Sequence, residues 1–164
     1  GEKLTKRKAG DKLIAVSPWE TPFKSAERIV DFLQRKGART LNIAGNGIYT
    51  WAKFKWDQDK LNIYMALMLQ EVHRKHPIES IRSGGQTGAD WAGLVAAEHL
   101  NIPGVGYFPK GFLQRGVNNI DFTQNKQELT KKMAEDVGKL VSYFNISSPL
   151  PTIVENHHGN SPGT

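Results

Sequence analysis

The sequence predicts an α/β protein with a parallel sheet of three to four strands flanked by about four helices. Short β-leaning segments alternate with helical patterns, which is typical of βαβ units with right-handed crossovers. Glycine-rich turns follow two of the predicted strands, and in such sheets ligands bind outside the carboxyl ends of the strands. The length of 164 residues favours a single domain.

The helices are recognised by apolar residues at a spacing of 3.6. We expect them over residues 25–36, 58–75, 88–100 and 124–144. Ser25 is the expected N-cap of the first helix, and Gly37 ends it. Asn125 and Glu128 form one capping-box pattern before the last helix, with Thr123 as an alternative cap. The expected buried face of that helix comprises Leu129, Met133, Val137, Leu140, Val141 and Phe144.

The strands are expected over residues 40–44, 78–82 and 105–108, with a polar loop from Pro109 to Asp121. Residues 13–16 are read as a short strand or docking segment, and residues 152–155 as an edge strand. We therefore expect a folded domain over 13–147 and a flexible tail over 148–164, where Ser, Pro, Asn, Gly and His dominate.

Composition restricts the chemistry and the partners. The chain has no cysteine, which excludes disulfides, thiolate metal sites and a cysteine nucleophile. The five histidines show no metal-ligand spacing, so no metal site is expected. The net charge is +6, and residues 1–12, expected to be a disordered arm, hold five Lys/Arg and two Asp/Glu. Such an arm can bind nucleic acid or another polyanion, although the reading that we favour is a solvated, disordered arm. No apolar run is long enough for a membrane span, and we expect a cytoplasmic protein.

The main functional candidate is the run Ser83-Gly84-Gly85-Gln86-Thr87-Gly88-Ala89-Asp90, which follows the second strand and opens a helix. Its glycines allow a sharp turn and close approach of a ligand, and the amides at a helix start favour a phosphate. The alternative is structural, because Thr87 and Asp90 match a T-x-x-D capping box. Asp90 is also the only candidate acid or base if the protein is an enzyme.

Two further loops should meet this run at the same edge of the sheet. The turn Gly45-Asn46-Gly47 lacks the third glycine of a dinucleotide fingerprint, since Thr50 stands there. The next residues carry Tyr49, Trp51, Phe54 and Trp56 beside Lys53 and Lys55. These rings either stack on a ligand or cover the sheet edge or a dimer contact. In the third loop, Lys110 and Arg115 are candidate phosphate partners or solvated charges.

The octapeptide, with Ile102-Pro103 and Phe108-Pro109-Lys110-Gly111, resembles the SLOG superfamily, closest to its molybdenum cofactor carrier branch. The resemblance spans about residues 40–112 and implies a Rossmann-like sheet that binds nucleotides or nucleotide-derived ligands, the molybdenum cofactor among them. It places Gly84, Gly85, Thr87, Gly88 and Asp90 in the ligand loop and Lys110 on the phosphate side.

The sequence departs from that family in three ways. Trp91 stands where the carriers have Arg, the Gly45-Asn46-Gly47 turn lacks the Arg that often follows the first strand of relatives, and no second glycine-rich turn with an acid follows. We therefore expect sensing or sequestration of the ligand rather than turnover, at a site completed by a homo-oligomer. The alternatives are nucleic-acid binding through the basic arm and the aromatic cluster, and hydrolysis of a nucleotide N-glycoside. The expected ligand-binding residues are Gly45, Asn46, Gly47, Tyr49, Trp51, Ser83, Gly84, Gly85, Gln86, Thr87, Gly88, Asp90, Lys110 and Arg115.

Overall fold

The computed structural model describes residues 12–147, which contain a parallel sheet in the order β1-β2-β3. Its strands are β1 (Thr40–Ile43), β2 (Ser80–Ser83) and β3 (Gly104–Gly106). Ile43 pairs with Ser83, which in turn pairs with Gly106, so the carboxyl ends of all three strands lie together. The structure confirms the predicted α/β, Rossmann-like fold.

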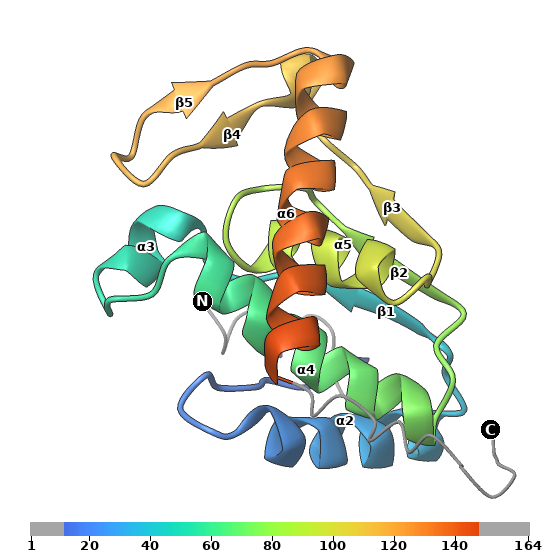
Figure 1. The fold of residues 1–164 in the computed structure, drawn as a ribbon. Helices are drawn as coiled ribbons and strands as arrows, with labels where there is room; N and C mark the ends of the chain where they lie inside the picture. The colour runs from blue at the N-terminus through green and yellow to red at the C-terminus, as the bar shows by residue number, and fades with distance from the viewer. Residues whose placement is uncertain (1–11, 148–164) are drawn as a thin grey trace, which may run out of the picture.

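The helices are α2 (Pro22–Lys36), α3 (Ile48–Ala52), α4 (Gln58–Lys75), α5 (Ala89–His99) and α6 (Lys126–Ser147). The central element is α5, which packs on all three strands and against α4 and α6, while α2 packs on α4. Figure 1 shows the long α6 standing across α4 and α5, in front of the sheet. Nine consecutive residues of α5, Ala89 to Ala97, are buried, because neighbours surround this helix on every side.

The second face of the sheet is exposed. Leu41, Ile43 and Ile81 pack into the core beneath the helices. Asn42, Arg82 and Val105 are paired in register on the opposite face, and all three are exposed. Parallel sheets are usually covered by helices on both faces. In the described part of this chain, the face of Asn42, Arg82 and Val105 is left uncovered.

The predicted first helix begins three residues too late. Thr21, not Ser25, is the N-cap, and its hydroxyl accepts a hydrogen bond from the Lys24 N–H at 3.2 Å. Pro22 occupies the first turn, where its missing N–H costs nothing. Ser25 is buried instead, with its Oγ 2.9 Å from the Tyr64 hydroxyl. Gly37 ends the helix in a left-handed conformation (φ +62°), as expected.

The last helix confirms one predicted cap. The Asn125 N–H donates to Glu128 Oε1 at 2.9 Å, and the Glu128 N–H donates to Asn125 Oδ1 at 2.8 Å. This reciprocal pair is the predicted capping box, and Thr123 is not the cap. Val141 was wrongly placed on the buried face, because it is exposed while its neighbour Leu140 is fully buried.

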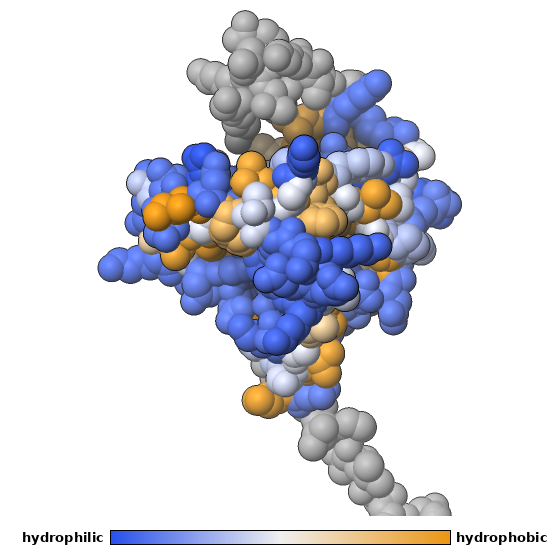
Figure 2. Space-filling view, turned by 90° about the horizontal axis from the view of Figure 1, so that it is seen from above, coloured by the Kyte–Doolittle hydropathy of each residue, from blue (hydrophilic) through white to orange (hydrophobic). Residues whose placement is uncertain are grey.

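The predicted polar loop after Pro109 contains structure that the sequence reading missed. It comprises a 3-10 turn, η2 (Lys110–Phe112), and an antiparallel hairpin of β4 (Gln114–Arg115) and β5 (Asp121–Phe122). The hairpin stands beside the upper end of α6 (Figure 1). Seen from above, small hydrophobic areas on this side are interrupted by hydrophilic side chains (Figure 2); Val117 and Ile120 are among the exposed apolar residues.

The expected strand at residues 13–16 does not form. The expected edge strand at 152–155, the tail and all but the last residue of the basic arm lie outside the described residues. Within residues 12–147, no helix combines the length and the apolar character required to cross a bilayer.

Candidate functional site

Two turns meet at the carboxyl edge of the sheet, as the sequence predicted. The Ala89 N–H donates a hydrogen bond of 3.1 Å to the carbonyl of Asn46, which lies in the turn after β1. The Ile48 N–H donates to Thr87 Oγ1 at 3.3 Å. These contacts join the Gly45–Gly47 turn to the Ser83–Asp90 turn, although about 40 residues separate them in the chain.

Asp90 is the buried centre of this junction. Its carboxylate accepts a hydrogen bond from the Gly45 N–H at 3.2 Å, and the N–H groups of Gln86 and Gly84 also bond to it. Burial raises the pKa of Asp90 above its ordinary value, while these three N–H groups act in the opposite direction. The predicted Thr87–Asp90 capping box is wrong: Gly88 is the N-cap residue of α5, and no side chain caps that helix.

Most amides of the glycine run are engaged within the protein. Ser83 Oγ accepts from the Gly85 N–H at 3.0 Å and donates to the Asp90 carbonyl at 2.9 Å. The Gly88 N–H donates to Gln58 Oε1 at 2.7 Å. The first turn differs: within the described residues, neither the N–H groups of Asn46 and Gly47 nor the Asn46 side chain makes a hydrogen bond. Within the described residues, the unengaged backbone donors of this site therefore include both N–H groups of the first turn, together with the Asp90 N–H at the start of α5.

Two glycines of the run are required by the backbone. Gly85 and Gly88 have φ of +81° and +88°, values that residues with a side chain rarely adopt. A β-carbon on Gly88 would overlap the Asn46 carbonyl oxygen, and one on Gly85 would overlap the Phe108 ring. Glycine at both positions allows the two turns to close against each other and against Phe108.

The hairpin contacts the glycine run through one side chain and a stretch of backbone. Buried Gln114 donates from Nε2 to the Gly85 carbonyl at 2.8 Å. The Arg115 N–H donates to Gln86 Oε1 at 2.7 Å, and Thr87 Oγ1 donates to the Arg115 carbonyl at 2.6 Å. The Arg115 guanidinium is paired with Asp121, at 2.7 Å from its Oδ1. Arg115 therefore reaches the site through its backbone rather than its charge.

Of the remaining predicted residues, only Trp51 is shown to contact the junction. Trp51 donates from Nε1 to the Asn46 carbonyl at 2.9 Å and so supports the first turn. The Tyr49 ring carries the ammonium of Lys53 at 4.6 Å from its centroid. Lys110 is exposed at the start of η2, and its side chain makes no hydrogen bond or ion pair with any other described residue.

Sequence reasoning missed three polar side chains that support the site. Gln58 and Gln114 bind the backbone of Gly88 and Gly85. Lys132, which is half-buried, donates to Gln114 Oε1 at 2.8 Å and lies 4.8 Å from the Trp91 ring centroid. Burial lowers the pKa of Lys132. Only Lys132 could have been noticed in the sequence, because it is a lysine within the apolar pattern of the last helix.

A shallow groove of about 480 Å³ lies between α5, β3 and α6, and its lining residue Phe108 also contacts the glycine run at Gly85. Its walls are mainly apolar, with Trp91, Leu94 and Phe108 among them. Within residues 12–147, no cluster of His, Asp and Glu is arranged to hold a metal ion. The polar functional candidates are therefore concentrated at the junction around Asp90.

One family model matches the chain. It is described as the circularly permutated YpsA SLOG family (cpYpsA), and it matches residues 81–135. The matched stretch begins in β2 and includes the glycine run, α5, β3, the hairpin and part of α6. The match covers about a third of the chain and supports the SLOG superfamily. No significant match was found among curated proteins or among solved structures.

Proposed function

We propose that the protein binds a nucleotide-derived, phosphate-bearing small ligand where the two turns meet at Asp90. The observation that carries the proposal is the pair of unengaged N–H groups of Asn46 and Gly47 beside a buried carboxylate. Their position at the carboxyl edge of a parallel sheet is where ligands bind in such folds. The SLOG match supports a nucleotide-related ligand in general terms.

Different residues of the site suit different parts of the ligand. The N–H groups of Asn46 and Gly47 suit a phosphate, and the exposed cation of Lys110 is a further candidate for it. Asp90 accepts three N–H groups, and a carboxylate has about four acceptor positions, so one remains for a ribose hydroxyl. The Ser83–Asp90 run therefore positions Asp90, and the first turn contacts the phosphate.

Binding without turnover is the form of the proposal that the residues favour. Hydrolysis requires a base or nucleophile held by a partner, and Asp90 is held by backbone N–H groups alone. The alternative, hydrolysis of an N-glycosidic bond, releases a free base that chromatography detects. The proposal includes a second copy of the chain that completes the site, and light scattering with and without ligand measures that association.

A thermal-shift panel tests the proposal. The panel contains NAD derivatives, cyclic nucleotides, molybdenum cofactor and oligonucleotides, each at two salt concentrations. A ligand at about 100 times its Kd stabilises the fold by about 2.7 kcal/mol, which corresponds to a Tm increase of several degrees. If no nucleotide derivative raises the Tm, the proposal is wrong.

Asn46→Asp is the informative variant, because it adds a negative charge at the expected phosphate position without changing the size of the side chain. We expect it to weaken binding at least 10-fold. Gln127→Glu is the matched control, since it makes the same amide-to-acid change on the exposed side of α6. Equal ligand responses from the two variants would place the phosphate elsewhere.

A further inference from the structure

Two exposed aromatic side chains from distant segments touch each other. Trp19 and Phe54 are 70% and 54% exposed, and their ring centroids lie 6.2 Å apart in an edge-on arrangement. Phe23, at the start of α2, is 55% exposed. Rings of this size usually bury most of their area, and clustered exposed aromatics mark interaction sites. We call Trp19, Phe23 and Phe54, with Lys24, Lys53 and Lys55, the aromatic patch.

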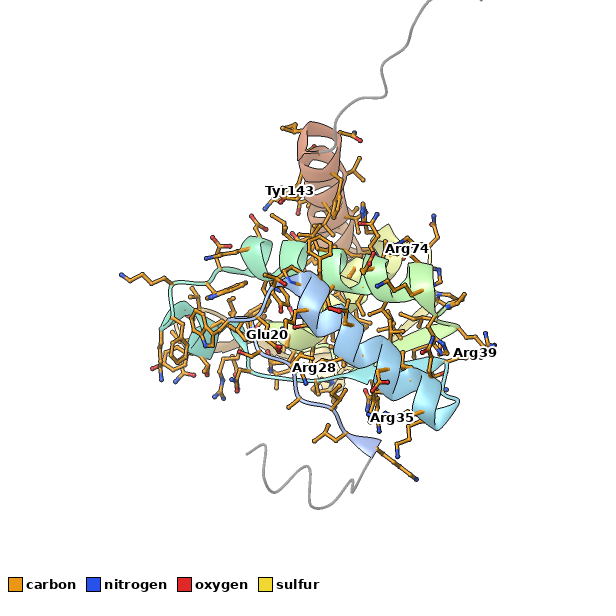
Figure 3. The ribbon with its side chains drawn as sticks, turned by 90° about the horizontal axis from the view of Figure 1, so that it is seen from below. Glu20, Arg28, Arg35, Arg39, Arg74 and Tyr143 are labelled. Carbon is orange, nitrogen blue, oxygen red and sulfur yellow. The ribbon has the colours of Figure 1, made fainter. Side chains whose placement is uncertain are left out.

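The turn that carries Trp19 is held in place. The Tyr64 hydroxyl lies 3.0 Å from the carbonyl oxygens of both Ser17 and Glu20. Arg28 pairs with Glu20 at 2.7 Å, and Figure 3 shows these two residues side by side near the start of α2. Trp19 is therefore presented on an ordered turn, so little conformational entropy is lost when a partner stacks on it.

The turn that carries Phe54 is equally defined. Trp56 is buried, and its N–H donates to the Trp51 carbonyl at 3.2 Å, which closes the end of α3. Lys55 takes a left-handed conformation (φ +66°) within this turn. Phe54 and its two lysine neighbours therefore lie together on the surface, against Trp19.

The charge around the rings is mainly positive. Lys24, Lys53 and Lys55 are exposed, and none of them forms an ion pair with another described residue. The acid beside Lys24 is Glu20, whose carboxylate is already paired with Arg28. The exposed Asp57 follows Lys55 by two residues, so the three lysines outnumber the unpaired acids near the contacting rings of Trp19 and Phe54.

We propose that the aromatic patch binds single-stranded nucleic acid. Unpaired bases stack on exposed rings, and lysines beside the rings meet the phosphates. A duplex does not present its base faces, so the rings select a single strand. Lys12 precedes Trp19 by seven residues, a span of at most about 25 Å, so Lys12 can contact the same strand. The proposal is independent of the small-ligand site.

Fluorescence anisotropy of a fluorescein-labelled 20-nucleotide oligo-dT tests the proposal with the full chain. With three or four lysine contacts, log Kd should change with log salt with a slope of about 2 to 3. Trp19→Ala should weaken binding about 5- to 100-fold, as expected for the loss of one stacked base. Lys53→Ala with Lys55→Ala should reduce the slope by about 1.4.

Two controls match these changes. Tyr107→Ala removes an aromatic ring that is 62% exposed but lies beyond β3. Lys126→Ala with Lys131→Ala removes two exposed charges from α6. The Tm of Trp19→Ala should stay close to that of the wild type, because the removed ring is mostly in solvent.

The proposal fails if the oligonucleotide does not bind at 50 mM salt, or if Trp19→Ala and Tyr107→Ala bind it equally. It also fails if Trp19→Ala instead abolishes self-association seen by light scattering, or binding to phosphatidylserine-containing vesicles, while the oligonucleotide affinity is unchanged. The Trp19→Ala variant should still show the thermal shift caused by a small nucleotide. That result would support the small-ligand site whether or not the variant binds the oligonucleotide.

Discussion

Replacing Ser83 with alanine removes a buried hydroxyl that joins two parts of the glycine run. The hydroxyl accepts from the Gly85 N–H at 3.0 Å and donates to the Asp90 carbonyl at 2.9 Å. Loss of a net-favourable hydrogen bond costs about 1 kcal/mol, and a buried group left without a partner costs about 1–3 kcal/mol. We expect the free energy of unfolding to fall by about 2 kcal/mol, which lowers the Tm by roughly 4–8 °C.

The matched control lies in the same strand. Ser80→Ala makes the same chemical change in β2, but it removes only a solvent-exposed hydrogen bond of 3.2 Å to the Thr40 hydroxyl. Its expected cost is below about 0.5 kcal/mol. Urea unfolding followed by circular dichroism measures both variants, with equal slopes expected. Equal losses for Ser83→Ala and Ser80→Ala would refute the role assigned to the buried hydroxyl.

Three further predictions concern single residues. Burial raises the pKa of Asp90 in the folded protein, so ionisation of Asp90 lowers the stability of the wild type as the pH rises from about 4 through the raised pKa. The stability of Asp90→Asn relative to wild type, measured by urea unfolding, should therefore increase from pH 4 to 7. A constant difference would contradict this. Lys55→Gly should raise the free energy of unfolding by about 0.5–1 kcal/mol, because Lys55 has φ +66°, whereas Lys53→Gly, at φ −63°, should give no gain in thermal melts. Lys132→Met keeps the apolar stem over Trp91 and should stay within about 1 kcal/mol of wild type, whereas Lys132→Ala should lose about 1–2 kcal/mol through lost packing; the opposite order in chemical denaturation would show that the charge dominates.

Local patterns predicted the elements whose determinants are local. The sequence reading placed the long helix at Gln58–Lys75, as observed, because its apolar stripe runs between two clear ends. The capping box of Asn125 and Glu128 formed because its two hydrogen bonds join residues three apart. Thr21 could also have been recognised as a cap, since Pro22 favours the first turn of a helix.

The errors arose where distant residues decide the outcome. Thr87 and Asp90 match a capping box, but Thr87 Oγ1 instead bonds Ile48 and Arg115, and Asp90 binds Gly45. No local pattern shows that these partners lie close by. The hairpin was missed because its strands have only two residues each, too few for a visible alternation. The convergence of the two turns was predictable, while the hydrogen bonds that occupy the loop amides were not.

An amide NMR titration tests the central claim most directly. We predict that addition of a nucleotide derivative identified by thermal shift displaces the ¹⁵N–¹H resonances of Asn46 and Gly47 most strongly, with smaller changes at Gly45 and Gly84. The resonances of Gly85 and Gly88 should move little, because their N–H groups are held by Ser83 and Gln58. Changes confined to the groove between α5 and α6, with Asn46 and Gly47 unaffected, would contradict the account.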